Sequence, residues 1–209
     1  MIELQTLDCT DSGIAECARI VKSGGVVVFP TDTVYGIGCD PYNNSAVSRV
    51  FAIKGREEKK PLPVLVGSIG DVESIVSLGP GGRTLAERFW PGALTIVAPL
   101  KDKRMPQGVT AGKNNLAVRV PANTCILGVL KFCRYLVGTS ANPSGKNAPK
   151  DAQSALQSLS GFDAILVYKG PLGGRESTVV DVTGPNPKII REGALSADAV
   201  MKVLRDERL

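Results

Sequence analysis

The sequence predicts a single α/β domain over residues 1–209, in which short strands and amphipathic helices alternate. Short apolar runs recur along the chain, and segments with helical spacing of apolar residues separate most of them. The last strands follow one another with little helix between them, so we expect a mixed sheet rather than a purely parallel one. No internal repeat, low-complexity tract or clear linker divides the chain.

Helices are expected where apolar residues recur at helical spacing and where a capping or stop residue bounds the segment. In the first of them, Ile14, Cys17 and Val21 follow this spacing, and Gly24 with Gly25 ends the helix. The expected helices are 11–23, 44–53, 71–78, 82–89, 122–132, 151–159 and 196–205.

Strands are expected at the short apolar runs, most of which are bounded by turn residues. The expected strands are 25–29, 62–66, 94–100, 116–120, 135–138, 164–168, 177–182 and 188–190. Two loops between them, 30–40 and 140–150, are rich in polar residues, glycine or proline. Since α/β sheets usually place ligands at strand ends, polar loops that follow strands are the first candidates for a site.

The composition restricts the chemistry that the chain can perform. It contains no histidine, which excludes Ser-His-Asp triads, Cys-His dyads and histidine-ligated metals. Its five cysteines are odd in number and form no CxxC pair, so we expect reduced core residues rather than a disulfide framework or a zinc site. A net charge of +5 and a pI of about 9.0 favour anionic partners such as nucleotides or RNA.

Nothing in the sequence suggests a membrane partner. The longest apolar runs fall well short of the roughly 18–20 residues needed to cross a bilayer. The first residues have neither a basic start nor the apolar stretch of a signal peptide. We therefore expect a cytoplasmic protein.

Two of the candidate loops come early in the chain. In 29–36, the hydroxyls of Thr31 and Thr33 flank a carboxylate; the alternative is a turn that uses these side chains to satisfy its own backbone. In 54–61, lysines and arginines stand in a KxR pattern that suits a polyphosphate, because arginine contacts oxygens bidentately and lysine is a mobile point charge. The alternative there is a solvated cluster of mixed charge.

Two further candidate loops come later. In 139–145, Ser140 and Asn142 can donate hydrogen bonds to phosphate or ribose, unless the segment is a plain turn. In 173–181, glycines allow close backbone approach to a ligand, and Arg191 follows the next strand, where it is either a pocket residue or a surface arginine. The chain has no GxxxxGK[ST] and no GxGxxG sequence, so a nucleotide would bind by another geometry.

Taken together, these segments carry a family resemblance. The blocks FPTDTVYGIG, KGR…KPLPVLV, WPGALTIV, AVRVP, SANPSG, ESTVVD and REG run in this order from Phe29 to Gly193. They resemble the YrdC-type threonylcarbamoyl-AMP synthase family in its short, single-domain form. The resemblance implies a twisted, largely parallel sheet, flanked by helices, around a concave basic cavity.

The resemblance also implies a reaction. L-threonine and bicarbonate give a carbamate, whose oxygen attacks the α-phosphate of ATP, releasing pyrophosphate and leaving threonylcarbamoyl-AMP. Mg²⁺ would arrive with ATP, and no metal bound by the protein itself is expected. A partner transferase would then modify tRNA, and tRNA or double-stranded RNA is a candidate partner of this chain.

Site residues follow from the resemblance position by position. Those expected at the reacting phosphates are Lys54 and Arg56. Those expected to bind the nucleotide are Arg56, Lys60, Asn115, Ser140, Asn142 and Arg191. Those expected to bind threonine are Thr33, Arg119, Gly138 and Ser177. Leu65 stands where certain relatives have a histidine that faces the amino acid.

Two other functions are compatible with the same residues. A non-catalytic protein that binds double-stranded RNA or tRNA would also use a basic cavity. Its weakness is that only 5% of the residues are aromatic and they are scattered, which disfavours a base-stacking surface. A carbamoyl-transfer domain of a larger maturation enzyme is the third reading, although the chain lacks the other modules of such an enzyme.

Overall fold

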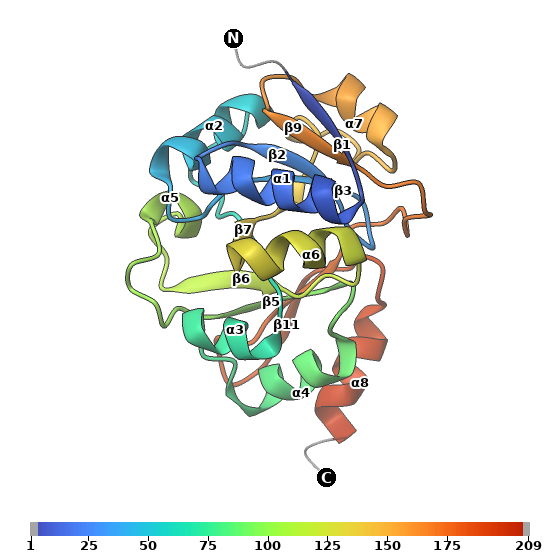
Figure 1. Ribbon diagram of the computed structural model, residues 1–209. Coiled ribbons are helices and arrows are strands. Elements are labelled where there is room, and N and C mark those ends of the chain that lie inside the picture. The colour runs from blue at the N-terminus through green and yellow to red at the C-terminus, as the bar shows by residue number, and fades with distance from the viewer. Residues whose placement is uncertain (1–3, 207–209) are drawn as a thin grey trace.

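The computed structural model describes residues 4–206 and arranges them as two β-sheets with helices around them (Figure 1). The strands are β1 (Gln5–Asp8), β2 (Val27–Pro30), β3 (Tyr35–Gly38), β4 (Val64–Val66), β5 (Leu94–Pro99), β6 (Asn115–Arg119), β7 (Tyr135–Val137), β8 (Thr139–Ser140), β9 (Ala164–Val167), β10 (Thr178–Asp181) and β11 (Lys188–Arg191). The helices are α1 (Asp11–Lys22), α2 (Asn44–Lys54), α3 (Ile69–Ile75), α4 (Gly79–Phe89), α5 (Gln107–Thr110), α6 (Thr124–Cys133), α7 (Ala152–Ser158) and α8 (Ala197–Asp206).

The first sheet has the strand order β1-β9-β2-β3-β8. β1, β9 and β2 run parallel, whereas β3 is antiparallel to both of its neighbours. Helices α1 and α6 lie side by side over this sheet, where an apolar cluster includes Val21, Phe29, Ile126 and Leu166. The packing of α1 on α6 therefore buries one face of the sheet.

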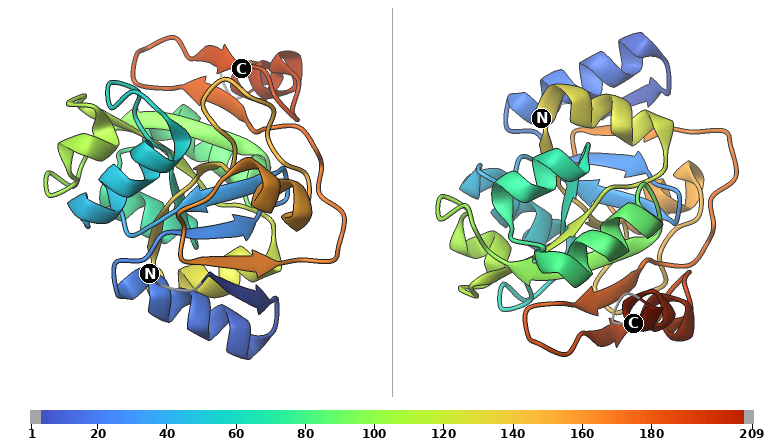
Figure 2. Two further views of the ribbon diagram at one scale, coloured as in Figure 1. Left: turned by 90° about the horizontal axis from the view of Figure 1, so that it is seen from above. Right: turned by 90° about the horizontal axis from the view of Figure 1, so that it is seen from below.

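The second sheet has the strand order β11-β10-β5-β6-β4-β7 and alternates between antiparallel and parallel pairs. Helix α4 packs on β5 and on α8, and α3 packs on β4. The larger apolar cluster takes residues from both sheets, among them Val28 and Ile37 from the first and Ile96 and Val118 from the second. In Figure 2, β11 and α8 lie on one side of the molecule, and β1 with α1 lies on the opposite side.

The α/β class and the mixed pairing are confirmed, with two differences from the expected sheet. There are two sheets instead of one, and parallel pairs do not predominate among the described strands. The cause is local: the turn 31–34 joins β2 directly to β3 as an antiparallel pair, and β7 and β11 add antiparallel neighbours.

Strand β3 lies in a segment that the sequence predicts to be a loop. Its glycines are poor strand formers, so the sequence pattern did not indicate a strand there. The structure explains them: a Cβ at Gly36 would lie 2.7 Å from Cε2 of Phe29, and one at Gly38 would collide with the carbonyl oxygen of Val137. Glycine therefore lets β3 pass close to its neighbours. β1, β8 and α5 are likewise elements that the sequence did not predict.

The cysteines correct another expectation. Cys9 and Cys125 form a disulfide with a Cα–Cα distance of 5.6 Å, whereas Cys17, Cys39 and Cys133 are free. The prediction of five reduced cysteines is therefore wrong for two of them. The two partners are 116 residues apart, so their proximity arises only from the packing of α6 beside the junction of β1 and α1.

None of the helices between residues 4 and 206 combines the length and apolar character needed to span a membrane.

Candidate active site

A cavity of about 460 Å³ opens where the two sheets meet. Its walls come from the turn 31–34, β3 and β8 of the first sheet, and from β4, β5, β6, β10 and β11 of the second. Nine of the eleven predicted site residues line it: Thr33, Arg56, Lys60, Asn115, Arg119, Gly138, Ser140, Ser177 and Arg191. The fold thus gathers residues that are up to 158 positions apart around one space, measured from Thr33 to Arg191.

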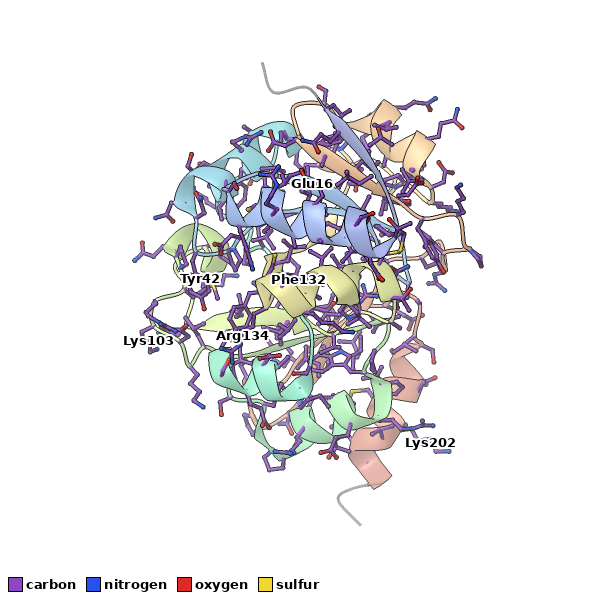
Figure 3. All side chains as sticks on the ribbon, viewed as in Figure 1. Glu16, Tyr42, Lys103, Phe132, Arg134 and Lys202 are labelled. Carbon is purple, nitrogen blue, oxygen red and sulfur yellow. A yellow bond between two sulfur atoms is a disulfide. The ribbon has the colours of Figure 1, made fainter. Side chains whose placement is uncertain are left out.

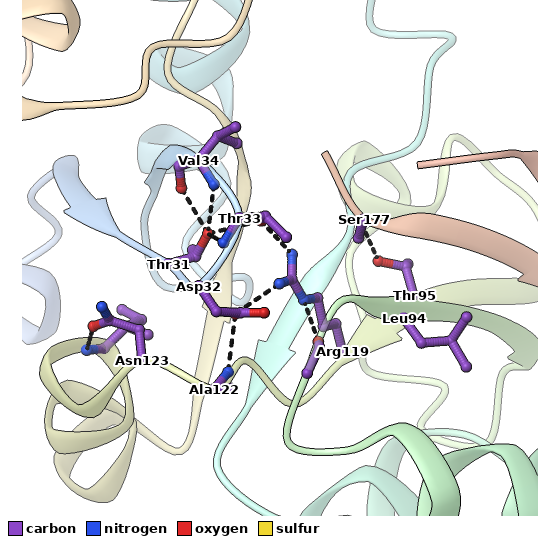
Figure 4. Close-up of polar contacts among 12 residues, drawn as sticks. Thr31, Asp32, Thr33, Val34, Leu94, Thr95, Arg119, Ala122, Asn123 and Ser177 are labelled. Carbon is purple, nitrogen blue, oxygen red and sulfur yellow. Dashed lines mark hydrogen bonds and ion pairs between the residues drawn. The ribbon is translucent and has the colours of Figure 1, made fainter. Parts of the chain in front are cut away.

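One wall is built around the buried guanidinium of Arg119, at the end of β6 (Figure 4). Nη2 lies 2.7 Å from Oδ1 of Asp32, Nη1 donates to Oγ1 of Thr33 at 3.0 Å, and Nε donates to the carbonyl oxygen of Gly92. Burial lowers the pKa of Arg119, and the Asp32 carboxylate opposes this shift. Because an arginine stays protonated in proteins, this wall carries a fixed positive charge.

The turn before β3 fixes the residues that hold this arginine. The hydroxyl of Thr31 donates to the carbonyl oxygen of Val34 at 2.6 Å and accepts from the backbone N–H groups of Thr33 and Val34. Asp32 also accepts from the backbone N–H of Ala122 at 2.9 Å, which ties the turn to the segment before α6. The PTDT sequence is therefore a self-satisfied turn that at the same time presents its polar groups to the cavity.

Two more hydroxyl groups in this wall lie in contact with each other. Oγ1 of Thr95, on β5, lies 2.8 Å from Oγ of Ser177, and both residues line the cavity (Figure 4). The segment before Ser177 is held against the turn 31–34, because the N–H groups of Gly173 and Gly174 donate to the carbonyl oxygens of Asp32 and Thr33. The segment thereby connects the turn of the first sheet to β10 of the second.

The opposite wall is cationic and begins at the end of α2. Gly55 ends the helix in the left-handed conformation, with φ +56°, so the chain turns sharply between Lys54 and Arg56. Arg56 lines the cavity, where its Nη2 donates to the carbonyl oxygen of Pro61 at 2.9 Å and its Nε to that of Lys60. Burial lowers the pKa of Arg56, and Glu176 opposes the shift.

Lys54 differs from its prediction, since it does not line the cavity. Its ammonium group is buried and donates to the carbonyl oxygens of Ser140 and Asn142, the second at 2.7 Å. Burial lowers the pKa of Lys54 to about 8, and the nearby charge of Arg56 adds to the shift. The helix end directs this side chain inward, where it holds the 140–146 loop instead of facing phosphate oxygens.

Asn142 differs in the same way. Its amide nitrogen donates to the carbonyl oxygens of Pro143 and Lys146, so the side chain closes its own loop and does not border the cavity. Its Oδ1 is buried without a hydrogen-bond partner among the described residues. Of the SxN pair, only Ser140 reaches the cavity.

Arg191, at the end of β11, faces the cavity from a third side. Its Nη1 lies 3.0 Å from Oε2 of Glu176, and its Nη2 donates to the carbonyl oxygen of Ser177. The ion pair is about 40% exposed on each side, so water screens it. Glu176 therefore partly neutralises a cation that would otherwise be available to an anionic ligand.

Several lining residues were not predicted as site residues. They are Thr31, Thr95, Lys113, Glu176 and Asp181, and Asp32 stands directly behind the wall. The sequence pointed to the PTDT segment as a whole, but nothing in it distinguished Thr95 or Lys113 from other strand and loop residues. Among the lining residues, five cations face two carboxylates, so the cavity suits an anionic ligand.

Gly138 has a steric reason to be glycine. A Cβ there would collide with the side chain of Leu65, which also lines the cavity. Gly138 thus makes room for the side chain of Leu65 beside the cavity.

A second, smaller cavity of about 210 Å³ lies on the face shown in Figure 3, between Tyr42 and Arg134. Its polar groups are already paired: Tyr42 donates to Asp102, Arg104 contacts the same carboxylate, and Arg134 contacts Asp71. Because these pairs satisfy one another, the larger cavity is the better candidate for a site.

Comparison with protein families gives one clear match. A family model named for Sua5, YciO and YrdC and described as telomere recombination matches residues 19–193. A threonylcarbamoyl-AMP synthase of Bacillus subtilis is 35% identical over 201 residues, which are 95% of this chain and 58% of that protein. A putative threonylcarbamoyl-AMP synthase of Mycobacterium tuberculosis H37Rv is 35% identical over 96% of this chain and 95% of its own length.

Solved structures agree with this match. Sua5 of Pyrococcus abyssi, crystallised with L-threonine, superposes with a TM-score of 0.90 at 33% identity, over 97% of this chain and 61% of that one. YciO of Escherichia coli superposes with a TM-score of 0.82 over 92% of this chain and 96% of its own, but at 23% identity it supports the fold alone. The chain therefore spans little more than half of some relatives and nearly all of others.

Proposed function

The chain belongs to the Sua5/YciO/YrdC family, and on this premise we propose that it is a threonylcarbamoyl-AMP synthase, which condenses L-threonine, bicarbonate and ATP to threonylcarbamoyl-AMP and pyrophosphate. The observation that carries the proposal is that one cavity has two different walls. One wall contains the buried Arg119 and several hydroxyl groups, and the other contains a group of cations. An amino acid and a nucleotide need these two surfaces.

The wall around Arg119 suits the amino acid. The guanidinium has five N–H donors and uses three of them on Gly92, Thr33 and Asp32, so two remain for a carboxylate. Ser177 and Thr95 add hydroxyls within the same wall. The Pyrococcus structure, which is that of a relative complexed with L-threonine, supports threonine as the amino acid.

The cationic walls suit the phosphates of ATP. Arg56, Lys60 and Arg191 border the cavity, and Ser140 and Asn115 supply polar groups beside them. Lys54 and Asn142 do not line the cavity but hold the loop that carries Ser140. Arginine and lysine are the residues that most often compensate phosphate charge.

The chemistry needs no histidine. The carbamate formed from threonine and bicarbonate is already an anionic oxygen nucleophile, and its attack on the α-phosphate expels pyrophosphate. Repulsion between this anion and the triphosphate opposes the reaction, so alignment and positive charge from Arg56, Lys60 and Arg191 are what the site contributes.

Mg²⁺ would enter with ATP and would supply further charge compensation when bound. No group of three or more acidic or cysteine side chains that could hold a metal occurs among residues 4–206. Glu176 and Asp181, which line the cavity, are the carboxylates available near it. We propose that the product passes to a transferase that modifies tRNA and that both proteins act in the cytoplasm.

The first test measures pyrophosphate release from MgATP by the purified protein, with and without L-threonine and bicarbonate. We expect release that requires both, with serine a poor substitute. Release that ignores threonine would contradict the proposal and indicate another ATP-cleaving activity. No release from folded protein would contradict it and favour the RNA-binding reading.

A matched pair of variants then tests the site. Arg56→Ala is expected to lower adenylate formation by at least about 100-fold, because it removes a charge at the phosphates. Lys202→Ala, which removes an exposed cation on α8 (Figure 3), is expected to leave the rate unchanged. Near-normal turnover of Arg56→Ala would count against the assigned site.

A further inference from the structure

The disulfide between Cys9 and Cys125 lies close to the cavity wall along the chain. Cys125 is the second residue of α6 and follows Arg119 by six positions, and Cys9 lies at the junction of β1 and α1. In the cytoplasm of mesophiles a disulfide is unusual, and those that occur are usually transient and catalytic or redox-sensing. The bridge is therefore a candidate for regulation of the proposed reaction as well as for stability.

One carboxylate oxygen connects the start of α6 to the cavity wall (Figure 4). Oδ1 of Asp32 accepts from Nη2 of Arg119 at 2.7 Å and from the backbone N–H of Ala122 at 2.9 Å. Ala122 directly precedes Asn123, whose side chain caps α6 by accepting from the N–H of Cys125. A shift of the first turn of α6 therefore alters a hydrogen bond that fixes Asp32, and with it the ion pair that holds Arg119.

The two bridged sulfur atoms differ in their access to solvent. Cys125 is fully buried, whereas Cys9 is partly exposed, so an external thiolate reaches the sulfur of Cys9. Its attack forms a mixed disulfide with Cys9, and the electron pair of the original S–S bond leaves on Cys125, at the positive end of α6. A second external thiolate then displaces Cys9. Two molecules of a monothiol such as glutathione thus become one external disulfide, and their two protons pass to the two protein thiolates.

Two free cysteines near the bridge do not compete in this exchange. Cys17 and Cys133 belong to the apolar cluster between α1 and α6. Burial raises the pKa of Cys17 to about 12 and that of Cys133 to about 11. Because only the thiolate attacks a disulfide, both side chains are inert at neutral pH. Exchange in this cluster is therefore confined to Cys9 and Cys125.

Reduction displaces the start of α6. It replaces a covalent bond by a contact between two thiols, so the two sulfur atoms must move apart. Cys125 packs in the same apolar cluster as Ile126 and Val129, and a close-packed interior transmits such a movement instead of absorbing it. The first turn of α6, which carries the link to Asp32, therefore shifts.

We propose that the Cys9–Cys125 disulfide is a redox switch of the amino-acid wall of the cavity, and that the oxidised protein binds L-threonine more tightly than the reduced protein. The inference rests on the proposed function, since it takes threonine to bind at the wall around Arg119. The phosphate side responds less, because Arg56 binds carbonyl oxygens of its own loop and not the segment 119–125.

The test measures the dissociation constants of L-threonine and of MgATP, each alone, for the oxidised and the reduced full chain. Isothermal titration is carried out at a temperature at which circular dichroism shows both forms folded, and alkylation counts the thiols. We expect reduction by glutathione to expose two further thiols and to weaken threonine binding by about fivefold or more, while the affinity for MgATP stays within about twofold. In NMR spectra the Ala122 amide should shift on reduction, whereas that of Arg56 should not.

Two serine variants form a matched pair. Cys9→Ser removes the bridge, so it should bind threonine as weakly as the reduced protein and should not respond to reductant. Cys133→Ser removes a free thiol from the same helix and should keep the full redox response. If Cys9→Ser does not fold, reduction of the unmodified protein still provides the comparison.

The outcomes separate the switch from the proposed function. Equal or tighter threonine binding by the reduced form overturns the inference, and so does an equal weakening for threonine and MgATP, which would indicate general loosening. A bridge that opens only when the protein unfolds is purely structural and overturns it as well. Failure of the oxidised protein to bind L-threonine at all overturns the proposed function instead.

Discussion

At the residue scale, the most consequential feature is a buried charge with one carboxylate partner. Arg119 is 5% exposed, and of the described side chains only Asp32 offers it a negative charge at ion-pair distance. Removing one partner of such a pair leaves the other charge uncompensated in the interior, which costs far more than the loss of a surface pair. Asp32 is therefore as important to the wall as the arginine that faces the cavity.

Asp32→Asn is predicted to lower the free energy of unfolding by about 2–4 kcal/mol and to raise the KM for threonine more than that for ATP. The reason is that Arg119 loses its counter-ion and Ala122 loses part of its tie to the turn. Denaturant unfolding and steady-state kinetics measure the two effects. The control is Arg83→Gln, which breaks exposed pairs with Glu73 and Glu87 and should change stability by less than about 1 kcal/mol. Equal effects of the two variants would refute the buried-pair account.

Lys54 leads to a prediction about pH. The folded state lowers its pKa from 10.5 to about 8, so between these values the unfolded chain binds a proton that the folded chain does not. Stability contributed by this group therefore rises with pH across that window, because the burial of the charged form is relieved. Relative to Lys54→Met, which lacks the titration, the unmodified protein should gain on the order of 2 kcal/mol between pH 7 and 10. A flat difference between the two unfolding profiles would show that Lys54 keeps its ordinary pKa.

At the element scale, the start of α6 connects several parts of the molecule. Asn123 caps the helix by accepting from the N–H groups of Cys125 and Ile126, and Ala122 before it binds Asp32. The disulfide from Cys125 to Cys9 anchors the same turn to the junction of β1 and α1. The helix that packs on α1 is thus tied at its first turn both to the cavity wall and to the N-terminal strand.

Reduction of this disulfide is predicted to lower the free energy of unfolding by about 2–5 kcal/mol, because the bridge closes a long loop in the unfolded chain. Cys9→Ser should reproduce the loss and make stability insensitive to reductant. Titration of thiols in the unfolded, oxidised protein should give three, namely Cys17, Cys39 and Cys133. Five thiols would show that the bridge does not form.

At the scale of the whole molecule, the site exists only because two sheets share one apolar core. Val28 and Ile37 of the first sheet and Ile96 and Val118 of the second belong to the same cluster, so we expect residues 4–206 to unfold as one unit. The cavity lies between these sheets and combines the charges of both. The net charge of the residues that line the cavity therefore affects the binding of every anionic ligand.

Glu176→Gln is predicted to tighten ATP binding by about twofold to tenfold at low salt, because it removes a carboxylate that competes for Arg191. The gain should shrink at high salt, since the pair is partly exposed and screened. Arg56→Ala should weaken ATP binding and provides the matched comparison. Isothermal titration at two salt concentrations measures both. Weaker binding by Glu176→Gln would mean that this carboxylate serves the nucleotide or its metal ion.

By itself the sequence determined the α/β class, most helices and strands, and nine residues that the structure places around the cavity. The class and the elements follow from short-range regularities, namely helical spacing and apolar runs, which chain neighbours alone can encode. The nine residues follow from the family resemblance of the sequence blocks. Only the tertiary structure decided that there are two sheets, that β3 can be a strand of glycines, and that Cys9 meets Cys125. It also turned Lys54 and Asn142 away from the cavity, brought Thr95 and Glu176 to it, and placed Asp32 behind its wall. These outcomes depend on the direction in which a side chain points from its helix or strand and on the segments that pack against it. Contacts between segments distant in the sequence determine the direction and the packing.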